Sequence, residues 1–181
     1  MQPIDPNDMP ETLTCHGIVP RAWQERNPNA WGNIKYARTN GGTPVRVWVP
    51  KPTTRLPERY FCHGWATGTY PLYGYTPFSG VPMLTVLEEE WTAVDEPQVH
   101  DIMVWFEVSG EYAGMPCHSA RVEEWSGNGL ILSSKNGTAP LQRRIPLDEV
   151  DDTYFYSSDV PTERHLYRSR TRLPRIDFPV E

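Results

Sequence analysis

Residues 100–137 read HDIMVWFEVSGEYAGMPCHSARVEEWSGNGLILSSKNG, and this stretch decides the fold. Its first part, Asp101 to Val108, contains a short apolar run that predicts a strand buried on both faces. Two more strands are expected from Cys117 to Glu124 and from Leu130 to Ser134, joined by a hairpin turn at residues 126–129. Three consecutive strands with short connections predict an antiparallel meander.

Outside this stretch the sequence predicts short elements. Val45 to Val49 alternates with period two, which is typical of a strand. Cys62 to Thr69 is a candidate short helix, and Pro82 to Trp91 is the best helix, with an apolar stripe and its glutamates facing outward. Asp152 to Ser157 is expected to be a last strand. A helical half followed by strands indicates an α+β fold, with short helices packed on the meander.

The 181 residues suffice for one domain with a sizeable core. We expect an irregular, proline-rich arm with one short strand over residues 1–57 and a core over residues 58–160. Residues 161–181 are expected to be a C-terminal extension that is packed on the core or partly flexible.

Charge and composition exclude several classes of partner. The net charge of −6 argues against nucleic acid, because phosphate binding needs a basic surface. No apolar run approaches the ~20 residues that span a bilayer, so no membrane partner is expected. The N-terminus has neither the basic start nor the apolar stretch of a signal peptide, so the chain is expected to be cytoplasmic as made. Three cysteines without a signal predict at least one free thiol.

All three cysteines precede a histidine directly, at Cys15, Cys62 and Cys117. Thiolate and imidazole are the two halves of a cysteine-hydrolase dyad, and both also bind transition metals. Zinc sites usually space their ligands as Cys-x-x-Cys or His-x3-His, and neither spacing fits these pairs. The sequence therefore favours the hydrolase interpretation, and no metal and no cofactor are expected.

The order of four short motifs resembles papain-fold cysteine hydrolases of the NlpC and CHAP type over about residues 58–137. The motifs are Phe61-Cys62-His63-Gly64-Trp65-Ala66, His100-Asp101-Ile102-Met103-Val104-Trp105, His118-Ser119-Ala120-Arg121-Val122 and Leu130-Ile131-Leu132-Ser133-Ser134-Lys135-Asn136-Gly137. The pattern departs from that family at Phe61, where a polar residue is usual, at His100, where glycine is usual, and at Cys117, where threonine or proline is usual. The resemblance implies a papain-like fold.

Elementary chemistry assigns roles to these motifs. Cys62 at a helix start would be the nucleophile, and His118 on a facing strand would be the base. A helix N-terminus and an imidazolium would both lower the pKa of the thiol. A third polar group on the next strand would orient His118, with Ser134 ranked slightly above Ser133 and Asn136 left open.

The other candidate residues surround the nucleophile. The backbone N–H of Cys62 and the hydroxyl of Tyr60 are candidates for an oxyanion hole. His63 is expected on the substrate side or at the surface, because neighbours on a helix diverge. Trp65 is a further candidate for binding the substrate. Cys15 is expected to be structural, and Cys117 is expected to point away from His118 into the core.

The sequence thus predicts a cysteine hydrolase that cleaves an amide bond in a peptide or protein substrate. The resemblance implies peptidase or amidase activity, with cell-wall peptide as a plausible substrate, and the same fold also serves deamidases and acyltransferases. A bacterial toxin or effector, exported by a dedicated machine and paired with an inhibitor or immunity protein, is one form of this hypothesis. The alternative is a non-enzymatic, aromatic-rich binding module with an incidental thiol.

Overall fold

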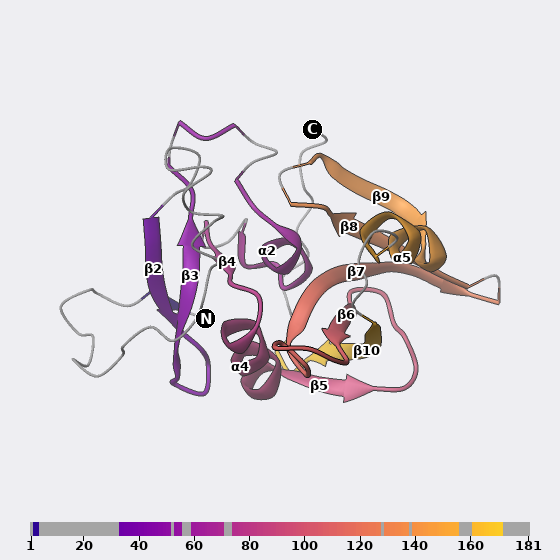
Figure 1. Ribbon diagram of the computed structural model, residues 1–181, viewed down its shortest axis with the longest axis horizontal. Coiled ribbons are helices and arrows are strands. Elements are labelled where there is room, and N and C mark those ends of the chain that lie inside the picture. Colours follow the sequence, from indigo (N-terminus) through magenta and orange to yellow (C-terminus); the bar gives the residue numbers. More distant parts are fainter. Residues whose placement is uncertain are drawn as a thin grey trace.

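The computed structural model describes residues 2–3, 33–51, 53–55, 59–70, 74–127, 129–137, 139–155 and 161–171. Within these residues the fold mixes helix and sheet, with mostly antiparallel strands and a few short helices (Figure 1). The α+β prediction is therefore confirmed at this level.

Two sheets organise the chain. The first has the order β1-β2-β3-β4, with strands β1 (Gln2–Pro3), β2 (Asn33–Arg38), β3 (Pro44–Val49) and β4 (Thr76–Pro77). The second has the order β5-β10-β6-β7-β8-β9, with strands β5 (Trp91–Val94), β6 (Ile102–Glu107), β7 (Pro116–Ser126), β8 (Gly129–Lys135), β9 (Leu141–Pro146) and β10 (Thr162–Ser169). The helices within the described residues are α2 (Cys62–Ala66), α4 (Val81–Glu90) and α5 (Leu147–Phe155).

The predicted meander is present as β6, β7 and β8. Ile102 pairs with Arg121 across β6 and β7, and Ser126 pairs with Gly129 where the β7–β8 hairpin closes. The strand predicted at residues 45–49 is confirmed as β3. The arm that was expected to hold one strand also contributes β2, which pairs with β3 along its whole length.

The second sheet carries an apolar cluster on each face, as a doubly buried β6 requires. On one face Val104 and Phe106 pack with α4 residues such as Leu87. On the other face Met103 and Trp105 pack with residues of β7, β8, β9 and α5. Alternation along β6 sends its side chains to the two clusters in turn.

Two predictions about segments that form helices need correction. A strand was expected at residues 152–157, but Leu147–Phe155 form the helix α5, so the prediction is wrong for residues 152–155. Residues 156–160 lie outside the described residues. Asp148 and Glu149 in its first turn favour a helix start. In α4 the glutamate at position 90 faces inward instead of outward, and its carboxylate accepts a hydrogen bond from the backbone N–H of Asn40 at 3.0 Å.

The C-terminal extension supplies an internal strand. β10 pairs with β5 on one side and with β6 on the other, so both neighbours are antiparallel to it. An ion pair links this strand to the start of β6: Arg168 Nη2 lies 2.8 Å from Asp101 Oδ2. Residues 162–169 are therefore part of the sheet that carries the predicted site.

Candidate active site

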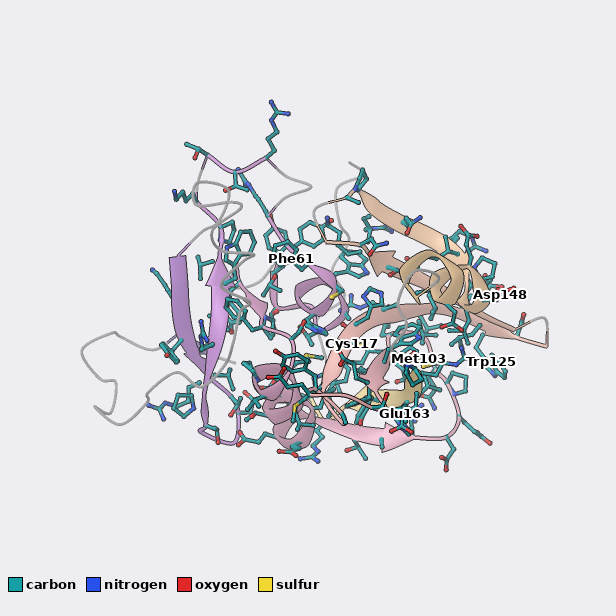
Figure 2. All side chains as sticks on the ribbon, viewed as in Figure 1. Phe61, Met103, Cys117, Trp125, Asp148 and Glu163 are labelled. Carbon is teal, nitrogen blue, oxygen red and sulfur yellow. The ribbon has the colours of Figure 1, made fainter. Side chains whose placement is uncertain are left out.

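The predicted nucleophile starts a very short helix. Cys62 is the first residue of α2, and Phe61 precedes it as an extended N-cap without a side-chain cap. The ring of Phe61 lies 4.8 Å from that of Trp48 on β3, which anchors the helix start to the first sheet (Figure 2). Gly64 permits a close approach to β4, because a Cβ there would lie 2.2 Å from Thr76 Oγ1. The helix is shorter than the predicted span of residues 62–69.

The predicted base and its predicted orienting group are in direct contact. His118 Nε2 lies 2.9 Å from Ser134 Oγ, and both side chains are buried. The imidazole also packs on the indole of Trp105, with ring centroids 5.2 Å apart. Of the three candidates that the sequence left open, Ser134, which was ranked slightly above Ser133, is the one that contacts His118.

The neighbours His118 and Ser119 on β7 contact different groups. The next residue, Ser119, turns its hydroxyl toward α2, where Oγ lies 2.8 Å from His63 Nδ1. Neighbouring side chains on a strand point to opposite faces, so His118 faces the cluster of Trp105. The structure brings His118 and Ser134 together, and the backbone N–H of Ser119, the residue after His118, hydrogen-bonds the thiol of Cys62.

The thiol of Cys62 is uncharged in this state. Burial raises its pKa to about 11, although hydrogen bonding from the backbone N–H of Ser119 opposes the shift most strongly. The charge of Lys135 opposes it more weakly. The sequence predicted a thiol pKa lowered by the helix start, and this is wrong because desolvation outweighs the short dipole of a five-residue helix.

Both buried histidines are neutral as well. Burial lowers the pKa of His63 to about 3. Burial also lowers the pKa of His118 well below its ordinary value, and the nearby His63 adds to the shift. The resting pair is therefore thiol and imidazole, and not thiolate and imidazolium.

His63 is buried in the interior, whereas the sequence predicted a position on the substrate side or at the surface. Its side chain is 1% exposed. Its ring bridges Ser119 on β7 and Ser79, whose Oγ lies 3.0 Å from Nε2. In a neutral imidazole one nitrogen donates and the other accepts, so two serine hydroxyls satisfy both. His63 therefore ties α2 to β7.

The two aromatic candidates pack together beside Cys62. The rings of Tyr60 and Trp65 have centroids 6.1 Å apart, and Tyr60 also stacks on Tyr70 at 4.4 Å. Trp65 Nε1 donates a hydrogen bond to Ser133 Oγ at 2.9 Å. Ser133 thus serves Trp65 on one face of β8, whereas Ser134 serves His118 on the other. Asn136 is half-buried just beyond the end of β8.

The remaining cysteines differ in position. Cys117 is a half-buried free thiol near the start of β7, and its Sγ donates to the carbonyl oxygen of Trp105 at 3.3 Å (Figure 2). Burial, followed by the charges of Glu107 and Cys62, raises its pKa to about 12. Cys15 lies outside the described residues.

Two buried cations, Lys135 and Arg121, lie beside α2 and were not among the predicted site residues. Lys135 is fully buried; its Nζ lies 4.9 Å from the centroid of the Tyr60 ring and donates to the carbonyl oxygens of Gly137 and Ala139. Arg121 is also buried. Arg121 could have been identified as a charged residue at an inward-facing position of its strand. That position is recognised only when the register of the strand is known.

Within the described ranges, no group of three or more His, Cys, Asp or Glu side chains is placed to hold a metal ion. In the same ranges no helix has both the length and the apolar character needed to cross a membrane. No model of a known protein family matches the chain, and neither any curated protein nor any solved structure matches it. The likeness to papain-fold hydrolases thus rests on the sequence motifs alone.

Proposed function

We propose that the protein is a cysteine hydrolase of papain-like fold that cleaves amide bonds, with Cys62 as nucleophile and His118 as base. The observation that carries this proposal is the hydrogen bond between His118 Nε2 and Ser134 Oγ. A histidine held by a third polar group on the next strand is the arrangement that a general base needs. Cys62 begins a helix packed on the strand that carries His118.

The chemistry then follows from the two ring nitrogens. Ser134 engages Nε2, so Nδ1 is the nitrogen that takes the proton of the thiol. The thiolate sulfur forms a bond to the carbonyl carbon of the substrate, and the imidazolium returns its proton to the leaving amine. Water then releases the acyl group from Cys62. The backbone N–H of Cys62 and the hydroxyl of Tyr60 are the proposed donors to the oxyanion.

The proposal includes an activation step. A pKa of about 11 leaves roughly one thiol in 10⁴ ionised at pH 7. Catalysis therefore requires that substrate binding bring Cys62 and His118 into contact, and catalytic contacts often tighten only in the substrate complex. The proposed substrate is a peptide or protein, with cell-wall peptide as the first to try. A deamidase or acyltransferase would use the same acyl-enzyme with a different acceptor.

Four single variants and one double variant test the proposal with cell-wall peptide fragments and with casein, by following the release of amines. Cys62→Ala and His118→Ala should each remove activity, and the double variant should lose no more, because the two groups act as one unit. Ser134→Ala should lower the rate about tenfold to a hundredfold, or ~1.4–2.7 kcal/mol of barrier. Ser133→Ala is the matched control and should lower it less. Retained hydrolysis in a folded Cys62→Ala protein would sink the assignment.

The raised pKa of Cys62 favours a second candidate, the non-enzymatic binding module. Alkylation by iodoacetamide separates the two in a background that carries Cys15→Ser and Cys117→Ser. A working dyad makes the alkylation rate of Cys62 depend on His118 once a peptide is bound. An inert thiol reacts at the same rate in the protein with His118 and in the His118→Ala variant. Its alkylation rate rises with pH until the pH approaches 11, the pKa of the thiol.

A further inference from the structure

Three neighbouring strands present a side chain to the indole of Trp65. From β7, the guanidinium carbon of Arg121 lies 5.6 Å from the ring centroid. From β8, Ser133 accepts the hydrogen bond of the indole N–H. From β9, the guanidinium carbon of Arg143 lies 5.4 Å from the centroid. Trp65 is 2% exposed, so a buried ring holds two cations in place.

The position of Arg143 depends on an irregularity in the sheet. β8 and β9 change register opposite Ser133, where Arg143 and Arg144 both stand. Arg144 has a φ of 54°, in the left-handed region that costs energy for a residue with a side chain. Its guanidinium points to Glu124, 2.8 Å away. A bulge re-aims side chains, and this one leaves Arg143 over Trp65.

The two arginines over Trp65 differ in exposure and in partners. Arg121 is 9% exposed, and its Nε and Nη2 donate to the carbonyl oxygen of Ala66, at the end of α2, at 3.3 and 3.1 Å. Arg143 is exposed, and in the part of the chain that the structure describes it makes no hydrogen bond and no ion pair.

The positive charges of Arg121 and Arg143 repel each other. Burial lowers the pKa of Arg121 to about 10; Glu123 opposes that shift, and the charge of Arg143 adds to it. Glu123 makes no ion pair with either arginine within the described residues. An anion bound near both guanidinium groups would offset the repulsion, which costs more in a partly desolvated setting than in water.

We propose that the cluster of Arg121, Trp65 and Arg143 binds a carboxylate of a peptide ligand. Guanidinium groups match the planar, two-oxygen geometry of a carboxylate, and a ring that holds them in place reduces the entropy lost on binding. The whole chain has a net charge of −6, so two adjacent cations are not a consequence of its composition. Arg143 is the accessible donor and Arg121 the buried one.

The cluster adjoins the proposed nucleophile. Trp65 follows Cys62 by three residues in α2, about one helical turn. The ligand of the cluster is then the substrate of the proposed hydrolase, which would be an acidic peptide. This last step rests on the proposed function, whereas the binding of a carboxylate does not.

Fluorescence anisotropy of the intact chain with a labelled oligoglutamate peptide tests the inference. The native protein should bind oligoglutamate and should not bind an oligoglutamine peptide of equal length. Arg143→Gln should weaken binding about tenfold, as expected for the loss of a charge-assisted hydrogen bond. Arg144→Gln removes the same charge one residue away and should stay within about twofold of the native protein, because its surface ion pair contributes little.

Several outcomes would overturn the inference. Equal losses in Arg143→Gln and Arg144→Gln would indicate attraction by net charge alone. Equal binding of oligoglutamine, or tighter binding of a single-stranded oligonucleotide, would exclude the carboxylate. Arg121→Met, with its folding checked by circular dichroism, should weaken binding at least as much as Arg143→Gln; unchanged binding by the folded variant also contradicts the inference.

The experiments distinguish failure of the proposed carboxylate site from failure of the proposed hydrolase activity. Hydrolysis of peptides without any preference for oligoglutamate would overturn the carboxylate site and leave the hydrolase standing. Tight binding of oligoglutamate by a protein that hydrolyses nothing would leave the site standing and overturn the hydrolase.

Discussion

Two buried histidines make the site sensitive to acid. His63 and His118 are both fully buried, and each forms a hydrogen bond to a serine hydroxyl. Burial lowers both pKa values, so the folded protein resists taking up the protons that the unfolded chain binds near pH ~6.5. For such groups the stabilisation is complete above the unfolded pKa and is lost as the pH falls toward the folded pKa.

We expect the free energy of unfolding to drop on acidification. Between pH 7 and pH 5, His63 alone should remove about 2 kcal/mol, since its folded pKa of about 3 lies well below that range. His118 should add a loss of the same sign. Urea unfolding at several pH values measures the slope. His63→Gln should flatten it, whereas a substitution at the exposed His165 should leave it unchanged; equal slopes in all three proteins would contradict the prediction.

At the scale of elements, α2 is a helix that exists because of its surroundings. Its five residues contain a glycine and lack a side-chain cap, so helix propensity alone would not form it. Trp65 anchors it to β8, His63 to β7, and the absence of a side chain at Gly64 lets β4 approach. The stability of this helix therefore depends on its contacts with the three strands β4, β7 and β8.

Gly64→Ala should destabilise the protein although alanine is the better helix former. The new Cβ would lie 2.2 Å from Thr76 Oγ1 and 3.3 Å from Thr76 Cα, which is backbone. We expect a loss of about 1–3 kcal/mol, typical of overpacking, against a propensity gain of about 1 kcal/mol. Thermal unfolding measures it. Gly127→Ala, which meets nothing within 4 Å, is the control, and a Gly64→Ala protein as stable as that control would refute the packing argument.

At the scale of the whole molecule, the last strand holds the second sheet together. β10 lies between β5 and β6, so the chain must fold its C-terminal part before that sheet is complete. Arg168 on β10 donates through Nε and Nη2 to the two carboxylate oxygens of Asp101, at 2.9 and 2.8 Å. Asp101 is 3% exposed and precedes β6, where the meander begins.

Arg168→Met should lower the melting temperature more than Arg164→Met, by about twofold or more. Arg168 pairs with a buried carboxylate, and removal of one partner of such a pair leaves a desolvated charge uncompensated. Arg164 pairs with Asp151, and both of those side chains are more exposed than Asp101, so their ion pair contributes little. The combined variant Asp101→Asn with Arg168→Met should recover part of the loss. Equal shifts in the two single variants would count against a structural role for the Asp101 pair.

Local patterns were sufficient for the meander, and they ranked Ser134 slightly above Ser133 as the partner of His118. The apolar run of β6, the hairpin at residues 126–129 and the period of two along β8 need only neighbouring residues. That period separates Ser134 from Ser133, and the structure places Ser134 on His118 and Ser133 on Trp65. Catalysis by Cys62 and His118 remains a prediction.

Long-range packing settled the rest. The segment after residue 147 carries aromatic residues that suit a strand as well as a helix, and its contacts with β8 and β9 decide for a helix. The insertion of β10 joins residues far apart in sequence, which no periodicity records. The neutral state of Cys62 and the inward position of His63 depend on desolvation, which is summed over every neighbour in space. The sequence alone thus determined which side chains share a strand face, while only the assembled core determined which of them are charged.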